Sequence, residues 1–147
     1  MTSLPSVLVV EDDPAIRSLL TAALTRQPLN VDSAHDGVAA LERLACTDYV
    51  VVILDLMMPR MNGYAFLDAL REVRPGARPV VLVMTAGDHA QFGSLDPELV
   101  HACIRKPFDV HAVVDTIRGC AEIMSGVFET DSRSTATSLP QGMPPDR

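Results

Sequence analysis

Several apolar segments of this chain end on side chains that could hold a charged ligand. The residues at these ends are three carboxylates, one hydroxyl and one ammonium group. Each follows a short, mainly apolar run: Glu11 and Asp12 follow residues 7–10, Asp55 follows 49–54, Thr85 follows 79–84, and Lys106 follows 102–105. Carboxylate oxygens suit a divalent cation such as Mg²⁺, and a cation beside an ammonium group suits phosphoryl transfer.

Asp55 is the most informative of these residues. It ends residues 49–54, YVVVIL, whose length and β-branched composition are typical of a buried parallel strand. Open α/β sheets present the carboxyl ends of their strands at one edge, where ligands bind. We therefore expect Asp55 to lie at that edge, together with the side chains that end the other runs.

Helical patterns separate the expected strands, which are residues 7–10, 29–34, 49–55, 79–84 and 102–105. We expect helices from Pro14 onward with Asp13 as the N-cap, over 36–45, over 62–74 and over 109–124. A fourth helix over 88–99, before the last strand, is weakened by Gly93 and Pro97. The alternation predicts an α/β fold, with a five-stranded parallel sheet in the order 2-1-3-4-5 and helices on both faces.

Composition narrows the class of protein. The chain has 147 residues, enough for one domain, which we expect over 5–124, and the Ser-, Thr- and Pro-containing residues 125–147 are expected to be a disordered tail or linker stub. No apolar stretch is long enough for a membrane span. A net charge of −7 disfavours direct nucleic-acid binding. Three scattered cysteines without a CxxC pair indicate a reducing cytoplasm.

At four places the sequence resembles the receiver domain of two-component response regulators, in the stand-alone form of the chemotaxis receivers. The motifs are VVEDDP at 9–14 with Arg17, DLMMP at 55–59 with NG at 62–63, TA at 85–86, and KPF at 106–108. The resemblance covers roughly residues 5–124. It implies the flavodoxin-like receiver fold, and a function in which phosphorylation of an aspartate switches binding to a partner protein.

The resemblance implies a nucleophile and a metal site among the acidic residues. Asp55 would be the phosphoacceptor, a carboxylate that forms an acyl phosphate. Mg²⁺ would bind the side chains of Glu11, Asp12 and Asp55 and the backbone carbonyl of Met57. The cation would offset negative charge on the incoming phosphoryl group.

The resemblance also implies how the phosphoryl group is held and sensed. Thr85 and Lys106 would contact its oxygens, and a cis peptide bond before Pro107 would aim Lys106 at Asp55. This chain departs from the family at Cys103, where receivers usually carry an aromatic residue that swings inward. We expect Cys103 to be buried or half-buried, and the signal to pass instead through a rearrangement of residues 87–98.

The implied protein is not an enzyme. It would accept phosphate from a histidine kinase or a histidine phosphotransfer protein and then bind or release an output protein. One alternative is a receiver-like interaction module that works without phosphorylation. Another is a phosphatase of the haloacid dehalogenase type, but its motif needs a second aspartate where this chain has Met57. The chain could also be the receiver piece of a longer regulator.

Overall fold

A single sheet organises the protein. The structure is a computed structural model that describes residues 4–56, 63–73, 79–85 and 100–124. Its five strands are all parallel and lie in the order β2-β1-β3-β4-β5. Their bounds are β1 (Ser6–Val10), β2 (Asn30–Ala34), β3 (Val51–Asp55), β4 (Val80–Thr85) and β5 (Val100–Arg105). This confirms the strand order predicted from the sequence.

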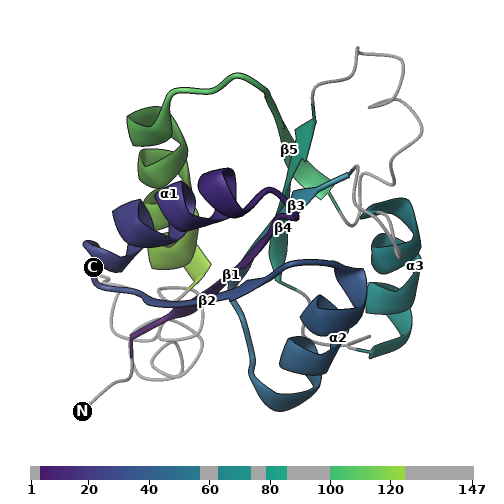
Figure 1. The fold of residues 1–147 in the computed structure, drawn as a ribbon. Coiled ribbons are helices and arrows are strands. Elements are labelled where there is room, and N and C mark those ends of the chain that lie inside the picture. Colours follow the sequence, from purple (N-terminus) through teal and green to yellow (C-terminus); the bar gives the residue numbers. More distant parts are fainter. Residues whose placement is uncertain (1–3, 57–62, 74–78, 86–99, 125–147) are drawn as a thin grey trace, which may run out of the picture.

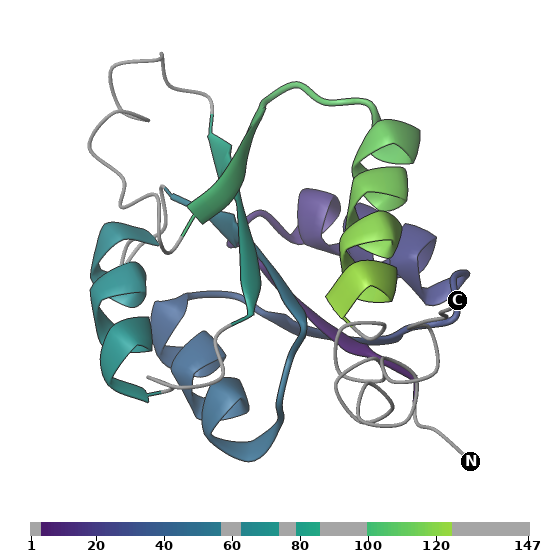
Figure 2. The same cartoon turned by 180° about the vertical axis from the view of Figure 1, so that it is seen from behind.

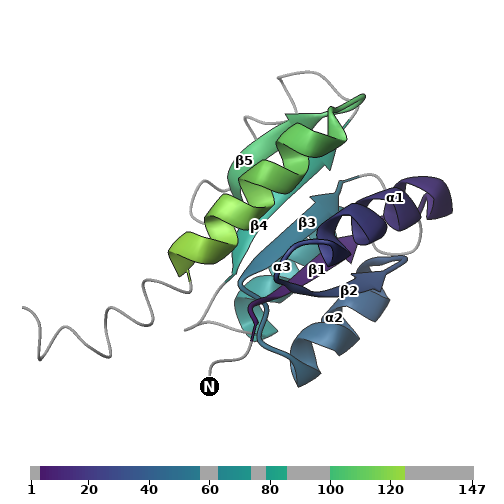
Figure 3. The ribbon, with the colours of Figure 1, turned by 90° about the vertical axis from the view of Figure 1, so that its left-hand side faces the viewer.

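Helices cover both faces of the sheet, as expected. Within the described ranges they are α1 (Pro14–Thr25), α2 (Gly37–Cys46), α3 (Gly63–Val73) and a helix over residues 110–124, hereafter the last helix. α1 and the last helix lie together on one face, and α2 and α3 lie on the other (Figures 1 and 2). In Figure 3 the face of the sheet that carries α1 and the last helix is turned toward the viewer. None of these helices has the length and apolar character needed to cross a bilayer.

The fourth helix expected over 88–99 and the tail expected over 125–147 lie outside the described residues. The remaining elements agree with the sequence-based bounds to within two residues at most ends.

Successive residues of the central strands point to opposite faces of the sheet. In β1, Leu8 and Val10 pack in the core beneath α2 and α3, whereas Val7 and Val9 pack beneath α1 and the last helix. β3 and β4 are buried along their whole length. A strand covered on both faces needs apolar residues at every position. This explains why its apolar run is continuous and why the polar residue at its carboxyl end stands out.

β5 differs from the central strands because it lies at the edge of the sheet. Among the described strands it pairs only with β4, and most of its residues are exposed. The ladder pairs Val81 with Val100 and then Leu82 with Ala102, so His101 forms a bulge. The Val81 backbone N–H donates to Nδ1 of His101 at 3.4 Å. The sequence predicted a strand over 102–105 only, whereas β5 begins at Val100. The bulge at His101 and the exposed positions of β5 interrupt the apolar pattern from which a strand is recognised.

α1 begins at a residue pair that suits a helix start. The Asp13 side chain accepts hydrogen bonds from the backbone N–H groups of Ala15 and Ile16 at 2.9 and 3.4 Å, and Pro14 occupies the first helical position. We expect Asp13→Ala to lower the free energy of unfolding by about 1 kcal/mol in urea denaturation. The control Asp115→Ala removes an exposed aspartate of the last helix and should cost less than about 0.5 kcal/mol. Equal losses would contradict the capping role.

Candidate functional site

The pairing of β1 with β3 brings the acidic residues together. Val10 lies opposite Leu54 in this ladder, so Glu11 and Asp12 leave β1 at the edge where β3 ends with Asp55. Each of these three side chains offers one carboxylate oxygen, and the three oxygens all lie within 4.8 Å of one another. The topology thus assembles an acidic cluster from two strands that are not consecutive in the chain, at the switch point of the sheet.

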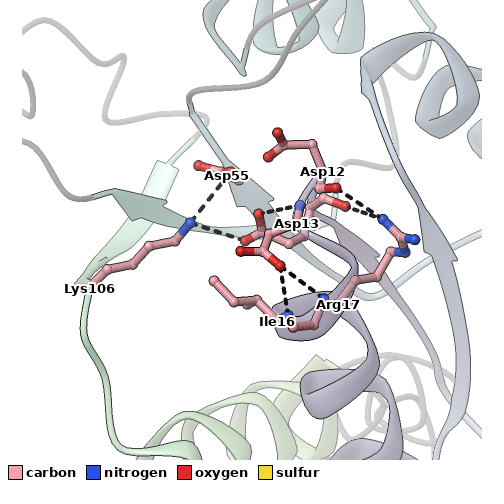
Figure 4. Close-up of polar contacts among 8 residues, drawn as sticks. Asp12, Asp13, Ile16, Arg17, Asp55 and Lys106 are labelled. Carbon is pink, nitrogen blue, oxygen red and sulfur yellow. Dashed lines mark hydrogen bonds and ion pairs between the residues drawn. The ribbon is translucent and has the colours of Figure 1, made fainter.

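Lys106 is the cation that balances this acidic cluster. It follows β5, and its Nζ lies 3.2 Å from Oε1 of Glu11 and 3.4 Å from Oδ2 of Asp55 (Figure 4). Glu11 and Asp55 are 0% and 3% exposed, whereas Asp12 is partly exposed. Buried carboxylates need a partner to offset the loss of hydration. Here one ammonium group serves both.

Crowding of the carboxylates alters the protonation of Glu11. Burial and the adjacent carboxyl group of Asp55 raise the pKa of Glu11 to about 7. Two contacts act in the opposite direction and lower this pKa. They are the Asp13 backbone N–H, which donates to Oε2 of Glu11 at 3.1 Å, and the Lys106 ammonium. Burial alone would lower the pKa of Lys106, but the negative charges of Asp55 and Glu11 outweigh it and raise that pKa. Near neutral pH, Glu11 is therefore poised between its neutral and ionised forms while Lys106 stays charged.

The acidic cluster fits a divalent cation. Oε1 of Glu11 is buried and accepts no hydrogen bond among the described residues, and the Lys106 ammonium lies 3.2 Å from it. Several carboxylate oxygens within a few ångströms of one another form the donor set that Mg²⁺ prefers. Asp12 is partly exposed, which leaves one side of the cluster open to the water molecules that Mg²⁺ usually keeps.

Thr85 and Lys106 lie in the far half of the sheet, at the end of β4 and directly after β5. Thr85 is buried at the carboxyl end of β4, which pairs with β3 so that Met84 lies opposite Asp55. The Lys106 N–H donates to the Thr85 carbonyl oxygen at 2.9 Å. The Lys106–Pro107 peptide bond is cis, the geometry expected from the sequence. Thr85 and Lys106 are the two residues that the sequence predicted to contact the phosphoryl group. Thr85 ends β4, the strand next to that of Asp55, and Lys106 directly follows β5, the strand beyond β4.

Cys103 does not lie where the sequence analysis placed it. Its side chain was expected to be buried or half-buried, and it is exposed. The physical reason is the edge position of β5, in which only Val100 and Ile104 pack against the core. Desolvation nevertheless raises the pKa of the Cys103 thiol, which favours the neutral form. Met57 and residues 87–98 lie outside the described residues.

Arg17 is a site residue to which the sequence analysis assigned no role. Its Nη1 donates to the backbone carbonyl of Glu11 at 2.9 Å and to that of Asp12 at 3.4 Å (Figure 4). Arg17 belongs to α1, so these bonds tie the turn at Glu11 and Asp12, hereafter the acidic turn, to the helix that follows it. The sequence offered one indication of this role, the position of Arg17 shortly after Glu11 and Asp12. Every residue has a backbone carbonyl, so the residue types of the partners do not reveal that Arg17 binds them.

Comparison with known proteins identifies the family. The response regulator receiver domain matches residues 7–118. The protein-glutamate methylesterase/protein-glutamine glutaminase 1 of Caulobacter vibrioides is 35% identical over 149 residues, which cover 96% of this chain and 42% of that protein. The transcriptional regulatory protein CpxR homolog of Haemophilus influenzae is 32% identical, with coverage of 76% and 48%. The chain therefore spans less than half the length of these curated relatives.

A solved structure agrees with the sequence comparisons. The response regulator protein TrrA from Thermotoga maritima, in complex with Mg(2+)-BeF, superposes with a TM-score of 0.68 at 26% identity, covering 80% of this chain and 99% of that one. Apart from Ser6, the receiver match includes all residues of the five described strands and the residues at their carboxyl ends. This chain belongs to the family of response regulator receiver domains.

Proposed function

We propose that this chain is the phosphoacceptor receiver of a two-component or phosphorelay system. The observation that carries the proposal is the buried carboxylate of Asp55, which lies beside the carboxylates of Glu11 and Asp12 and the ammonium group of Lys106. A carboxylate in such a site can act as a nucleophile toward phosphorus. Phosphorylation of Asp55 would then switch the binding of a partner protein.

The proposed reaction needs few chemical groups from the protein. A carboxylate oxygen of Asp55 attacks the phosphorus of a phosphohistidine, and the P–N bond breaks with its electron pair passing to the histidine nitrogen. The Lys106 ammonium, 3.4 Å from Oδ2 of Asp55, would pair with the phosphoryl oxygens, and Thr85 would donate its hydroxyl to them. Attack of water on phosphorus would later break the P–O bond to Asp55, releasing inorganic phosphate and the free carboxylate.

We propose that the acidic cluster holds Mg²⁺. The ligands would be the carboxylates of Glu11, Asp12 and Asp55, whose close approach supports the assignment, and the backbone carbonyl of Met57. When bound, Mg²⁺ would supply positive charge that stabilises the negative charge of the transferred group. Arg17 would hold the backbone of the two acidic residues in place through the carbonyl contacts described above.

The proposed partners follow from this chemistry. The phosphodonor would be a histidine kinase or a histidine phosphotransfer protein, and the partner that reads the phosphorylated state would be an output protein. We propose that residues 5–124 form the receiver and that 125–147 are a tail or linker, without direct nucleic-acid binding or enzymatic output. The three cysteines are free, which supports a cytoplasmic location.

A second candidate is a receiver at one end of a longer regulator. The relatives described above are named as a methylesterase/glutaminase and a transcriptional regulatory protein, and the chain spans only 42% and 48% of their lengths. In such a protein the output would be a further domain of the same chain. Phosphorylation of Asp55 would be required in both cases.

Phosphorylation of Asp55 can be tested directly. Acetyl phosphate with Mg²⁺ should add one phosphoryl group to the chain in intact-protein mass spectrometry, and Asp55→Asn should remove this uptake. Asp68→Asn makes the same chemical change at an exposed position of α3 and should leave uptake unchanged. Undiminished labelling of Asp55→Asn would refute the assignment, and full labelling in a chelator would refute the role of Mg²⁺. Absence of labelling in the unaltered chain would favour an interaction module that is not phosphorylated.

A further inference from the structure

A groove lies along β2 and α2, next to the acidic turn but separate from the cluster of carboxylates. Its volume is about 570 Å³, and its walls come from the end of β2, one side of α2 and Arg17 of α1. In the view of Figure 4, Arg17 lies on the opposite side of Asp12 from Lys106. A cavity of this size accommodates a small organic molecule.

Two arginines give this groove its chemical character. Arg17 and Arg43 both line it, and in the described part of the chain neither lies within ion-pair distance of a carboxylate. The contacts of Arg17 are to backbone carbonyls, which do not cancel its charge. A guanidinium group binds phosphate or carboxylate through two parallel N–H···O bonds. The groove therefore presents two positive charges without anionic partners.

The remaining walls suit an anion attached to an organic body. The hydroxyl-bearing residues Ser33 and Thr47 line the groove and could donate to anionic oxygens, while Ala34 and Ala39 add apolar surface. Glu42 also lines it, so the groove is not uniformly basic and favours one compact anionic group over a polyanion. General attraction of anions is not expected for a chain with a net charge of −7. Binding would therefore depend on the local arrangement of the two arginines.

We propose that this groove binds a small organic phosphate or carboxylate, with its anionic group between Arg17 and Arg43 and its organic body against Ala34 and Ala39. The inference is independent of the proposed phosphorylation, because it uses none of the side chains of the acidic cluster. Arg43 is the better residue to test, since no ion pair or hydrogen bond among the described residues joins its side chain to the acidic turn. Arg17 contacts the backbone of that turn.

The test is an amide NMR titration of the full chain without divalent cations, so that an anion cannot bind through Mg²⁺. The probes are phenyl phosphate, benzoate and phenol, which share an aromatic body and differ in the anionic group. Phenyl phosphate or benzoate should shift amides over residues 33–47, and comparison of the two identifies the preferred anion. Phenol should shift them far less.

Matched variants show whether the arginines are responsible. Arg43→Gln should weaken binding of the anionic probe about tenfold, the effect of losing one charge-assisted contact, and Arg43→Lys should restore part of it. Arg118→Gln removes an equally charged side chain from the last helix, where Arg118 pairs with Asp115, and should bind as the unaltered chain does. Unchanged amide positions outside the groove will verify that each variant is folded.

Three results would overturn the proposal. The first is the absence of amide shifts at millimolar concentrations of the anionic probes. The second is that phenol causes shifts as large as those of the anionic probes, which would show a purely apolar groove. The third is that Arg118→Gln weakens binding as much as Arg43→Gln does, which would show unspecific attraction. None of these results depends on labelling of Asp55. The groove and the phosphorylation site can therefore fail separately.

Discussion

Replacing Lys106 by methionine should destabilise the metal-free protein by about 3 kcal/mol at pH 8, because two buried carboxylates then lack their cation. At pH 5 the loss should be smaller by the share that the pairing with Glu11 contributes. The pKa of Glu11 is already raised to about 7, and removal of the nearby ammonium raises it further, so at pH 5 Glu11 is neutral and needs no counter-charge. Urea denaturation in a chelator at the two pH values measures the difference.

Two controls separate charge from packing in this experiment. Arg118→Met removes a cation that is 43% exposed and pairs with an exposed aspartate, and it should change stability by less than about 0.5 kcal/mol at either pH. Mg²⁺ should recover part of the loss at pH 8, because it supplies positive charge to the same carboxylates. If Lys106→Met costs the same at pH 5 as at pH 8, the charge of Glu11 contributes nothing to the loss and this explanation of its pH dependence is wrong.

The second large effect concerns the pH dependence of stability. The pKa of Glu11 is about 7 in the folded protein against an ordinary value of 4.5, so the folded state binds this proton more tightly than the unfolded state. The resulting stability is fully present below pH 4.5 and is lost as the pH rises through 7. Relative to Glu11→Gln, the metal-free protein should lose roughly 2–3 kcal/mol of unfolding free energy across this window.

Divalent cations should reverse this trend. The proposed Mg²⁺ would bind the ionised carboxylate, so its stabilising effect should be larger at pH 8 than at pH 5. Glu122→Gln alters an exposed glutamate of the last helix and should leave the pH profile of the unaltered chain in place. Parallel profiles for the unaltered chain and Glu11→Gln would show that Glu11 titrates normally.

The central part of the fold was predictable because burial on both faces leaves a strong signal. The residues of β3 and β4 must all be apolar until the strand reaches the carboxyl edge, so Asp55 and Thr85 were conspicuous. The parallel order then placed Glu11 and Asp12 beside Asp55 without any information beyond the alternation of strands and helices.

The parts that the sequence did not predict depend on contacts that residue types do not encode. Cys103 was misplaced because small side chains occur in cores and on edge strands alike, and its exposure follows from the position of β5 in the sheet. The bulge at His101 depends on how β5 meets β4. Arg17 binds backbone carbonyls, which every residue carries, so its contacts could be found only in three dimensions.

The non-consecutive pairing of β1 with β3 has a consequence for folding kinetics. β2 and α2 intervene in the chain, so bringing Glu11 to Asp55 requires closure of a long loop, with an entropic cost that a local contact does not carry. Contacts of this range form slowly. A cation held by the acidic cluster binds only after this closure. We therefore expect Mg²⁺ to act mainly by slowing the separation of β1 from β3, which would appear as a lower unfolding rate with little change in the refolding rate.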